Sequence, residues 1–166
     1  MNNPSILKHL RDILILPFTV TVIIPYLIYQ KEQHFISGMS VLFKILGSVV
    51  GLSGFSIFLY TVLLFRWIGK GTLAPWTPTL KLVISGPYRY CRNPMITGVF
   101  FILLGETLFF RSLAILQWAV LFFMINTVYF ILIEEPSLAK RFGSEYRRYK
   151  ESVPRWIPSS KPYKGV

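Results

Sequence analysis

The sequence has little cysteine and few acidic residues. Its single cysteine, Cys91, excludes an intrachain disulfide, and we assign this thiol no chemistry. Only seven Asp and Glu residues stand against eighteen Lys and Arg, which gives a net charge of +11. The basic residues flank apolar runs and form no separate basic domain, so they fit anionic lipid headgroups better than nucleic acid. We therefore predict membrane lipids as partners and no nucleic acid.

Apolar residues, in contrast, are abundant. They make up 53% of the 166 residues, a length that predicts a single domain over residues 1–166. A membrane-spanning helix needs ~20 apolar residues. Four runs approach or exceed that length: about 13–29, 38–65, 95–110 and 113–133. The third run is short, and prolines 17 and 25 predict a kink in the first. No small-residue cleavage site follows the first run, so we predict a retained helix rather than a signal peptide.

The distribution of Lys and Arg predicts the topology. The N-terminal lead, the connection over residues 66–93 and the C-terminal region are rich in basic residues, whereas the opposite side carries only Lys31 and Arg111. Four spans with both ends cytoplasmic fit this pattern. The predicted fold is all-α, an integral membrane helical bundle of about four spans. A tight C-terminal helical hairpin turns at Arg111–Ser112, and an amphipathic C-terminal helix follows.

The polar segments are interpreted as follows. The connection over 66–93 is irregular, with a weakly alternating, extended part at 80–84, and its length predicts a functional loop. The fourth run stops at residues 134–136, and apolar residues then recur at 138, 142, 146 and 149. This spacing predicts an amphipathic helix that lies on the membrane surface. Residues 159–166 are predicted to be a loose tail.

Small and polar residues inside the runs predict contacts between helices. Gly47 and Gly51 are four apart, which lets another helix approach closely, and Thr97, Gly98 and Gly105 allow the same in the short third run. Glu106 is costly in a membrane and should have a partner. Because both residues are almost equidistant from the turn at Arg111–Ser112, we predict a hydrogen bond from Glu106 to Gln117. Ser53 and Ser56 of the second run are the alternatives.

One polar stretch, Gly86-Pro-Tyr-Arg-Tyr-Cys-Arg-Asn-Pro-Met-Ile-Thr-Gly98, lies between two apolar runs. Pro94 disfavours helix at Asn93 and suits the first turn of the helix that follows. The N–H groups of that turn, together with Arg92 and Arg89, predict a site for a carboxylate or a phosphate. The alternative is a cytoplasmic loop whose arginines anchor to lipid headgroups.

The predicted hairpin brings Glu134 and Glu135 to the same end as Pro94. Two carboxylates, an arginine and a helix N-terminus would then converge at the cytoplasmic membrane surface. This set would complement a ligand with both an amine and a carboxylate. Alternatively, the two glutamates pair with Arg89 or Arg92 and tie the hairpin ends together. Both interpretations can hold at once.

Four ordered blocks carry a family resemblance: residues 86–98, Glu134-Glu135-Pro-Ser-Leu138, Phe142-Gly-Ser-Glu-Tyr-Arg-Arg-Tyr149 and Val153-Pro-Arg-Trp-Ile-Pro158. Over about 70–158 the sequence resembles the isoprenylcysteine carboxyl methyltransferase and phospholipid methyltransferase family. The resemblance implies a multi-span enzyme of a bacterial inner membrane or the endoplasmic reticulum that uses S-adenosyl-L-methionine, with its catalytic core at about 70–158. It implies a loop before the pocket at 70–75. The implied cofactor residues are Tyr88, Arg92, Asn93, Pro94 and Gly98, with Glu134 and Glu135 closing the pocket.

The sequence departs from this family at three places. Asn93 stands where the eukaryotic carboxyl methyltransferases have histidine, and Ile96 stands where tyrosine is usual. Residues 131–133 lack the arginine that the prenylcysteine enzymes carry just before the glutamate pair. The last two differences argue against a prenylcysteine substrate. They leave the predicted fold unchanged.

The predicted function is methyl transfer from S-adenosyl-L-methionine to a lipidic or prenylated acceptor, with Arg92 and Glu134 as the catalytic residues. Arg92 would face an acceptor carboxylate, whereas Glu134 would act as the base for an acceptor amine. No metal site is predicted. An NADPH-dependent membrane reductase of the sterol-reductase type and a non-catalytic membrane scaffold are the alternatives. The oligomeric state is left open.

Overall fold

The computed structural model describes residues 14–32, 41–69 and 81–165, which are helical apart from turns and connections and contain no strand. The predicted all-α fold is confirmed. Along the chain the elements are η1 (Leu14–Ile23), α2 (Ile24–Lys31), α3 (Val41–Leu64), η2 (Phe65–Gly69), η3 (Gly86–Arg89), α4 (Pro94–Phe110), α5 (Leu113–Tyr129), η4 (Phe130–Glu134) and α6 (Glu135–Ser152). The family-like loop at 70–75 and most of the predicted irregular connection lie outside the described residues.

Two of these helical segments, Val41–Gly69 and Leu113–Ser152, are long and apolar enough to cross a membrane. The helix Pro94–Phe110 is apolar but shorter. Large apolar side chains along both long segments face outward, including Leu52, Met124 and Leu132. Such extended apolar surface is expected against lipid. The apolar part of the second segment, residues 113–133, is about 31 Å long at ~1.5 Å per residue, which matches a ~30 Å hydrocarbon core, and the charged residues from Glu134 onward follow it.

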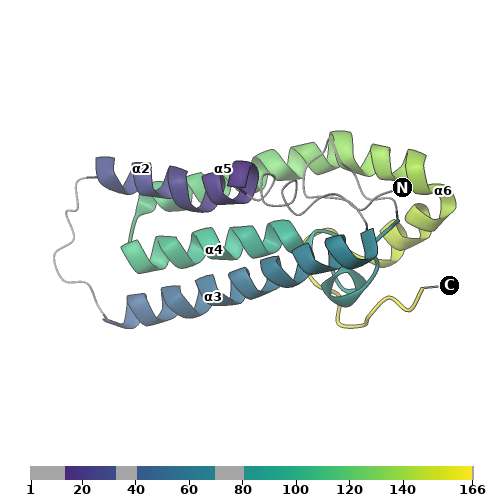
Figure 1. Cartoon of the computed structure of the whole chain (residues 1–166), viewed down its shortest axis with the longest axis horizontal. Helices are drawn as coiled ribbons and strands as arrows, with labels where there is room; N and C mark the ends of the chain where they lie inside the picture. The colour runs from purple at the N-terminus through teal and green to yellow at the C-terminus, as the bar shows by residue number, and fades with distance from the viewer. Residues whose placement is uncertain (1–13, 33–40, 70–80, 166) are drawn as a thin grey trace.

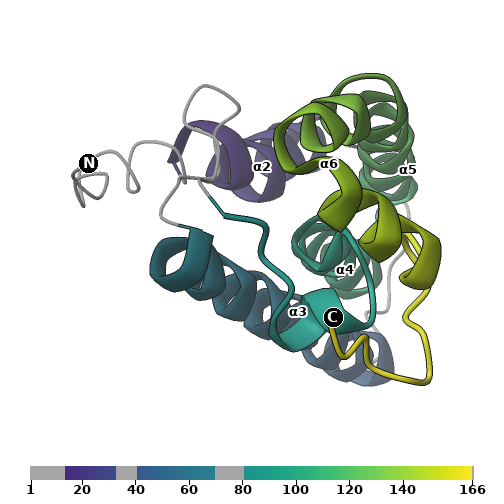
Figure 2. The same ribbon diagram turned by 90° about the vertical axis from the view of Figure 1, so that its right-hand side faces the viewer.

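Helix α4 lies between α3 and α5 (Figures 1 and 2), and it also contacts η1 and α2. The core of the bundle is formed by six buried side chains: Phe58, Val62, Val99, Leu103, Ala119 and Phe122. The indole N–H of Trp118 on α5 donates to the carbonyl of Val20 over 3.1 Å and so attaches the first helix to the bundle. Helices η1, α2, α3 and α5 pack against α4, and the first turn of α4 contains the last residues of the polar stretch (residues 86–98).

Glycines bring α3 and α4 into backbone contact, as predicted from the small residues. A Cβ atom placed on Gly105 would lie 2.5 Å from the backbone of Gly51, and one on Gly54 would lie 2.6 Å from the carbonyl oxygen of Gly98. A Cβ on Gly47 would meet the backbone of Gly105 at 2.6 Å. No side chain fits at these positions unless the helices separate. This contact fixes the distance between the two helices.

The predicted tight hairpin of α4 and α5 is confirmed. Arg111 ends α4 in the left-handed conformation, with φ of 52°, and Ser112 begins the next helix. The Ser112 hydroxyl accepts a hydrogen bond of 3.0 Å from the Ile115 N–H, which satisfies one donor of the first turn. The short turn brings the start of α4 and the end of α5 to the same end of the bundle.

The apolar run ends at residues 134–136, as predicted, but the helix that contains it does not end there. It continues through η4 into α6, and Pro136 lies in the first turn of α6. The Glu135 N–H bonds to the carbonyl of Phe130, five residues earlier, so the chain forms a wider π turn just before the proline. A π turn adapts the hydrogen-bond pattern to a residue that lacks a donor. The break comes later, at Gly143, where φ is +55°.

The predicted amphipathic character of α6 is confirmed, but its apolar face packs inside the protein. Tyr146 and Tyr149 are buried, together with Val153, against Leu82 and Ile84 of the preceding connection. Residues 81–84 form no strand with any described residue. The face that was expected to lie on lipid therefore covers the polar stretch instead.

The C-terminal segment is fixed in place, so the predicted loose tail was also wrong. The N–H of Ser159 donates to the carbonyl of Tyr90 over 2.9 Å, and the N–H of Tyr163 donates to the carbonyl of Arg89 over 2.8 Å. The Arg89 side chain returns a bond of 2.7 Å to the Tyr163 carbonyl. These bonds are made mainly by the backbone, so the polar composition of the segment did not reveal them.

The predicted partners of Glu106 are also wrong. One carboxyl oxygen of Glu106 is buried without a hydrogen-bond partner. Ser53 and Ser56 bond to carbonyls of their own helix, and Gln117 is exposed. Counting residues from the turn gave similar depths for Glu106 and Gln117, but it did not give the direction in which each side chain leaves its helix.

The glycine contact yields a matched pair of substitutions. Gly105→Ala should lower the free energy of unfolding by about 1–3 kcal/mol, because the new methyl group overlaps the α3 backbone. Gly51→Ala should be tolerated, because its Cβ would meet only the Gly105 Cα atom at 3.8 Å. Unfolding of the detergent-purified variants, followed by circular dichroism, measures both. Equal destabilisation by the two substitutions would contradict this account of the contact.

Candidate active site

A cavity of about 670 Å³ lies at the end of the bundle where α4 begins and α5 ends. Apolar side chains from the first helix, α3, α4 and α5 form most of its walls. Polar side chains also line it: Tyr88, Arg92, Asn93, Asn126, Tyr129, Glu134, Ser137, Arg141, Tyr146 and Tyr149. The cavity thus combines charged groups of both signs with a largely apolar lining.

Four of the seven residues predicted for the cofactor pocket line this cavity: Tyr88, Arg92, Asn93 and Glu134. The other three lie beside it. Pro94 begins α4 and is buried, Gly98 packs against α3, and Glu135 belongs to an ion cluster. The hairpin therefore brings the polar stretch and the glutamate pair together, but the two glutamates point to different surroundings.

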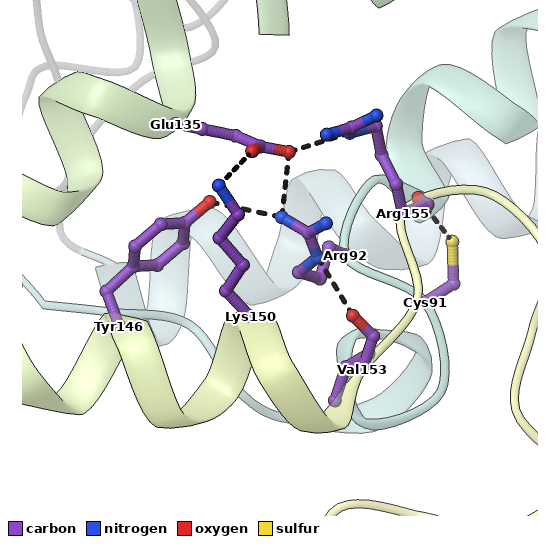
Figure 3. Close-up of polar contacts among 7 residues, drawn as sticks. All are labelled: Cys91, Arg92, Glu135, Tyr146, Lys150, Val153 and Arg155. Atoms are coloured by element: carbon purple, nitrogen blue, oxygen red, sulfur yellow. Dashed lines mark hydrogen bonds and ion pairs between the residues drawn. The ribbon is translucent and has the colours of Figure 1, made fainter. Parts of the chain in front are cut away.

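Glu135 holds three cations around one carboxylate (Figure 3). Its Oε1 atom accepts bonds of 2.8 Å from Arg92 Nη1 and 2.7 Å from Arg155 Nε, and its Oε2 atom lies 2.7 Å from Lys150 Nζ. The Glu135 side chain is only 4% exposed. Arg92 also donates from Nε to the Val153 carbonyl over 2.9 Å. The predicted pairing of a glutamate with Arg92 is present, and it involves Glu135.

The surrounding cations decide the charge of Glu135. Burial alone would raise the pKa of this carboxyl, but hydrogen bonds from Arg155 and Lys150 and the charge of Arg92 outweigh burial and lower the pKa to about 2. The bond to Glu135 raises the pKa of Arg155 in turn. Glu135 is therefore a carboxylate at neutral pH. It orients the Arg92 side chain that lines the cavity.

Glu134 has the opposite surroundings, although it is the next residue. It faces the cavity, and its carboxylate accepts one long bond of 3.4 Å from the Tyr129 hydroxyl. Burial raises the pKa of Glu134, and the bond from Tyr129 and the charge of Arg141 compensate only in part. Because successive residues on a helix point about 100° apart, one glutamate reaches the ion cluster and its neighbour reaches the cavity.

The C-terminal segment supports the polar stretch from the other side. The N–H of Arg92 donates to the Pro154 carbonyl over 2.9 Å, and the Cys91 thiol contacts the carbonyls of Arg155 and Trp156 at 3.2 Å each. Burial raises the pKa of the Cys91 thiol. The Trp156 ring packs on Phe123 and Phe130, 4.8 and 5.9 Å between ring centroids.

Sequence reasoning missed two groups of residues. Lys150 and Arg155, which complete the ion cluster, lie in a region that was predicted to bind lipid headgroups. The second group is a row on either side of Glu134, along α5, η4 and α6, that lines the cavity: Asn126, Phe130, Ser137 and Arg141. These positions follow helical spacings of three and four, so counting outward from Glu134 along one continuous helix would have found them.

Comparison with known proteins supplies the family. A sequence model described as "Phospholipid methyltransferase" matches residues 45–145, more than half of the chain. The chain belongs to the phospholipid methyltransferase family. The matched range runs from α3 into α6 and includes α4, α5 and most of the cavity lining. The predicted family resemblance is thereby confirmed.

A second comparison finds a short relative. A protein of Haemophilus influenzae, described only as an uncharacterized protein, is 35% identical over 63 residues, which is 38% of this chain and all of the relative. No solved structure matches the chain. Membership of the phospholipid methyltransferase family implies use of S-adenosylmethionine, and it agrees with the apolar helices of the fold.

The ion cluster predicts a specific pH dependence of stability. The pKa of Glu135 is about 2, below its ordinary value of 4.5, so the cluster contributes its full stability above about pH 4.5. This contribution is lost as the pH falls toward 2 and the carboxylate is protonated. We expect the thermal unfolding midpoint to fall over this range. Glu135→Gln should have a lower midpoint at neutral pH and a much flatter profile.

The measurement is the unfolding midpoint of detergent-purified protein at pH values from 7 to 2.5. Glu145→Gln is the matched control, because Glu145 is an exposed glutamate on the same helix. This control should keep the wild-type profile. Parallel profiles for wild type and Glu135→Gln would show that the ion cluster does not determine acid stability.

Proposed function

We propose that the protein is an S-adenosylmethionine-dependent methyltransferase that acts on a lipidic acceptor at the membrane surface. The observation that carries the proposal is the cavity, which is lined by positively and negatively charged side chains. It adjoins a bundle whose helices expose apolar side chains on their outer surface. Membership of the phospholipid methyltransferase family supports the same function. The acceptor is either an amine or a carboxylate.

The residues present fit the cofactor. The size of the cavity is suitable, because small-molecule sites commonly measure about 300–1,000 Å³ and this cavity measures about 670 Å³. An amino-acid group needs an anion for its ammonium and donors for its carboxylate. Glu134 would provide the anion. Arg92 and the N–H groups in the first turn of α4, near Met95 and Ile96, would provide the donors.

The chain's own residues then perform binding and orientation. When bound, the cofactor supplies a methyl group that its sulfonium already activates. The aromatic and aliphatic walls, including Phe58, Val99 and Phe122, would hold the apolar part of the acceptor and exclude water. Glu134 would take the proton of an acceptor amine, because burial raises the pKa of its carboxyl and so makes the carboxylate a stronger base.

Arg92 would act on an acceptor carboxylate only through the part of its guanidinium that remains directed to the cavity. Its Nε and Nη1 atoms bond to Val153 and Glu135. We therefore assign Glu135 as a positioning residue for Arg92 in this proposal. Ile96 lines the cavity where the related enzymes carry tyrosine, and the apolar residues 131–133 are exposed. Both features favour a lipidic acceptor over a prenylcysteine.

The test is isothermal titration of detergent-purified protein with S-adenosylhomocysteine. We expect Glu134→Gln to weaken binding at least about tenfold, because a buried charge-assisted hydrogen bond is worth roughly 1.5–3 kcal/mol. Arg92→Ala should weaken it as well. Glu145→Gln, at an exposed site on α6, should bind like the wild type.

The same titration separates the alternatives. Binding of NADPH in place of S-adenosylhomocysteine would replace the proposal with a reductase. Binding of neither ligand by folded wild-type protein would favour the scaffold. Unchanged affinity in both Glu134→Gln and Arg92→Ala would move the cofactor site elsewhere in the chain.

A further inference from the structure

A second, smaller cavity of about 240 Å³ lies between the first helix, α3 and α4. Nearly all of its lining is apolar, and the exceptions are Thr21 and Glu106. Pro17, Phe58 and Val99 line both this cavity and the large one, so the two share a wall. The proposed methyl transfer makes no use of the small cavity.

Glu106 leaves an unsatisfied acceptor at this cavity. Its Oε2 atom is buried and has no hydrogen-bond partner. Among the described residues of the lining, the other polar side chain is Thr21, and it donates its hydroxyl to the carbonyl of Pro17 over 2.8 Å. A buried carboxyl group without a partner is strongly unfavourable inside a membrane protein. An incoming donor would therefore gain a hydrogen bond that the described part of the chain does not supply.

The chemistry of the cavity selects the kind of donor. A purely apolar occupant would leave the Glu106 oxygen unsatisfied. An ammonium group would have to lose its hydration among apolar walls, which is costly. A hydroxyl loses less on desolvation, and it can donate to a carboxylate as well as to the carbonyl oxygen of a carboxylic acid. An apolar alcohol therefore fits whichever protonation state Glu106 adopts.

The size of the cavity narrows the choice further. One water takes about 30 Å³ of liquid volume, so this space is much larger than a single bridging water requires. It is also below the usual ~300–1,000 Å³ of a site for a larger ligand. We propose that the small cavity binds the hydroxyl end of a membrane-soluble alcohol, with the hydroxyl donating to Glu106 and the apolar chain lying along the shared wall. This is a lipid-hydroxyl site separate from the methyl-transfer cavity.

Two probes of nearly equal shape test the proposal on the detergent-purified full chain. 1-Decanol can donate a hydrogen bond, whereas decyl methyl ether cannot. We expect wild-type protein to bind 1-decanol about three- to tenfold more tightly than the ether, as one additional hydrogen bond predicts. Competition with a fluorescent fatty alcohol measures both affinities at one detergent concentration, so that both probes partition into the same micelles.

Substitutions of Glu106 assign the preference to this residue. Glu106→Gln keeps a carbonyl acceptor and should keep the preference for the alcohol, whereas Glu106→Leu should remove it. Gln117→Leu is the matched control, because Gln117 is a polar residue of the neighbouring helix and is exposed. It should keep the wild-type preference. The comparison in wild type and Glu106→Gln stands even where Glu106→Leu fails to fold.

Several outcomes overturn the proposal. Equal affinities for 1-decanol and its ether in wild type would do so, and so would a preference that persists in folded Glu106→Leu. Because the probes are measured without S-adenosylhomocysteine, the result is independent of the proposed function. Glu106→Leu that folds should still bind S-adenosylhomocysteine, and a wild-type protein that does not bind it would contradict only the methyltransferase proposal.

Discussion

The ion cluster around Glu135 is the interaction on which the arrangement of the site depends. One buried carboxylate joins Arg92 of the polar stretch to Lys150 of α6 and Arg155 of the C-terminal segment. Breaking a buried cluster by removing one partner is costly, because the remaining charges lose their compensation. The polar stretch is thus held, beside the cavity, to both ends of α6 and to the segment that follows α6. The bundle alone would leave the polar stretch without this support.

The glutamate pair shows how one short motif serves two purposes. Glu135 is surrounded by cations and remains charged, whereas Glu134 faces the cavity and has only a long bond to Tyr129. The difference follows from the angle between successive side chains on a helix. The chain stays helical from α5 into α6, because the π turn before Pro136 keeps both glutamates in helical geometry. The two side chains therefore leave the helix in different directions. A break at that position would have left their directions undetermined.

Much of this arrangement could be predicted from the sequence, because it follows from local rules. Glycine spacing predicted the close α3–α4 contact, and the proline and basic residues predicted the start of α4 and its polar surroundings. The lateral directions of side chains could not be predicted, so Glu106 was given partners that it does not reach. The fixed C-terminal segment was missed for a different reason. Its bonds are formed by backbone groups, which every sequence possesses, and only the fold decides where they meet.

The hydrogen bonds of that C-terminal segment also bear on the order in which the protein is made. Arg89, Tyr90 and Arg92 bond to residues 153–163, more than 60 positions later in the chain. During synthesis the earlier helices emerge first, and contacts between neighbouring helices can form at once. The polar stretch must wait for its partners until residues 153–163 have left the ribosome. A ligand that requires an oriented Arg92 therefore finds its site only after this C-terminal segment has been made, and not on the earlier helices alone.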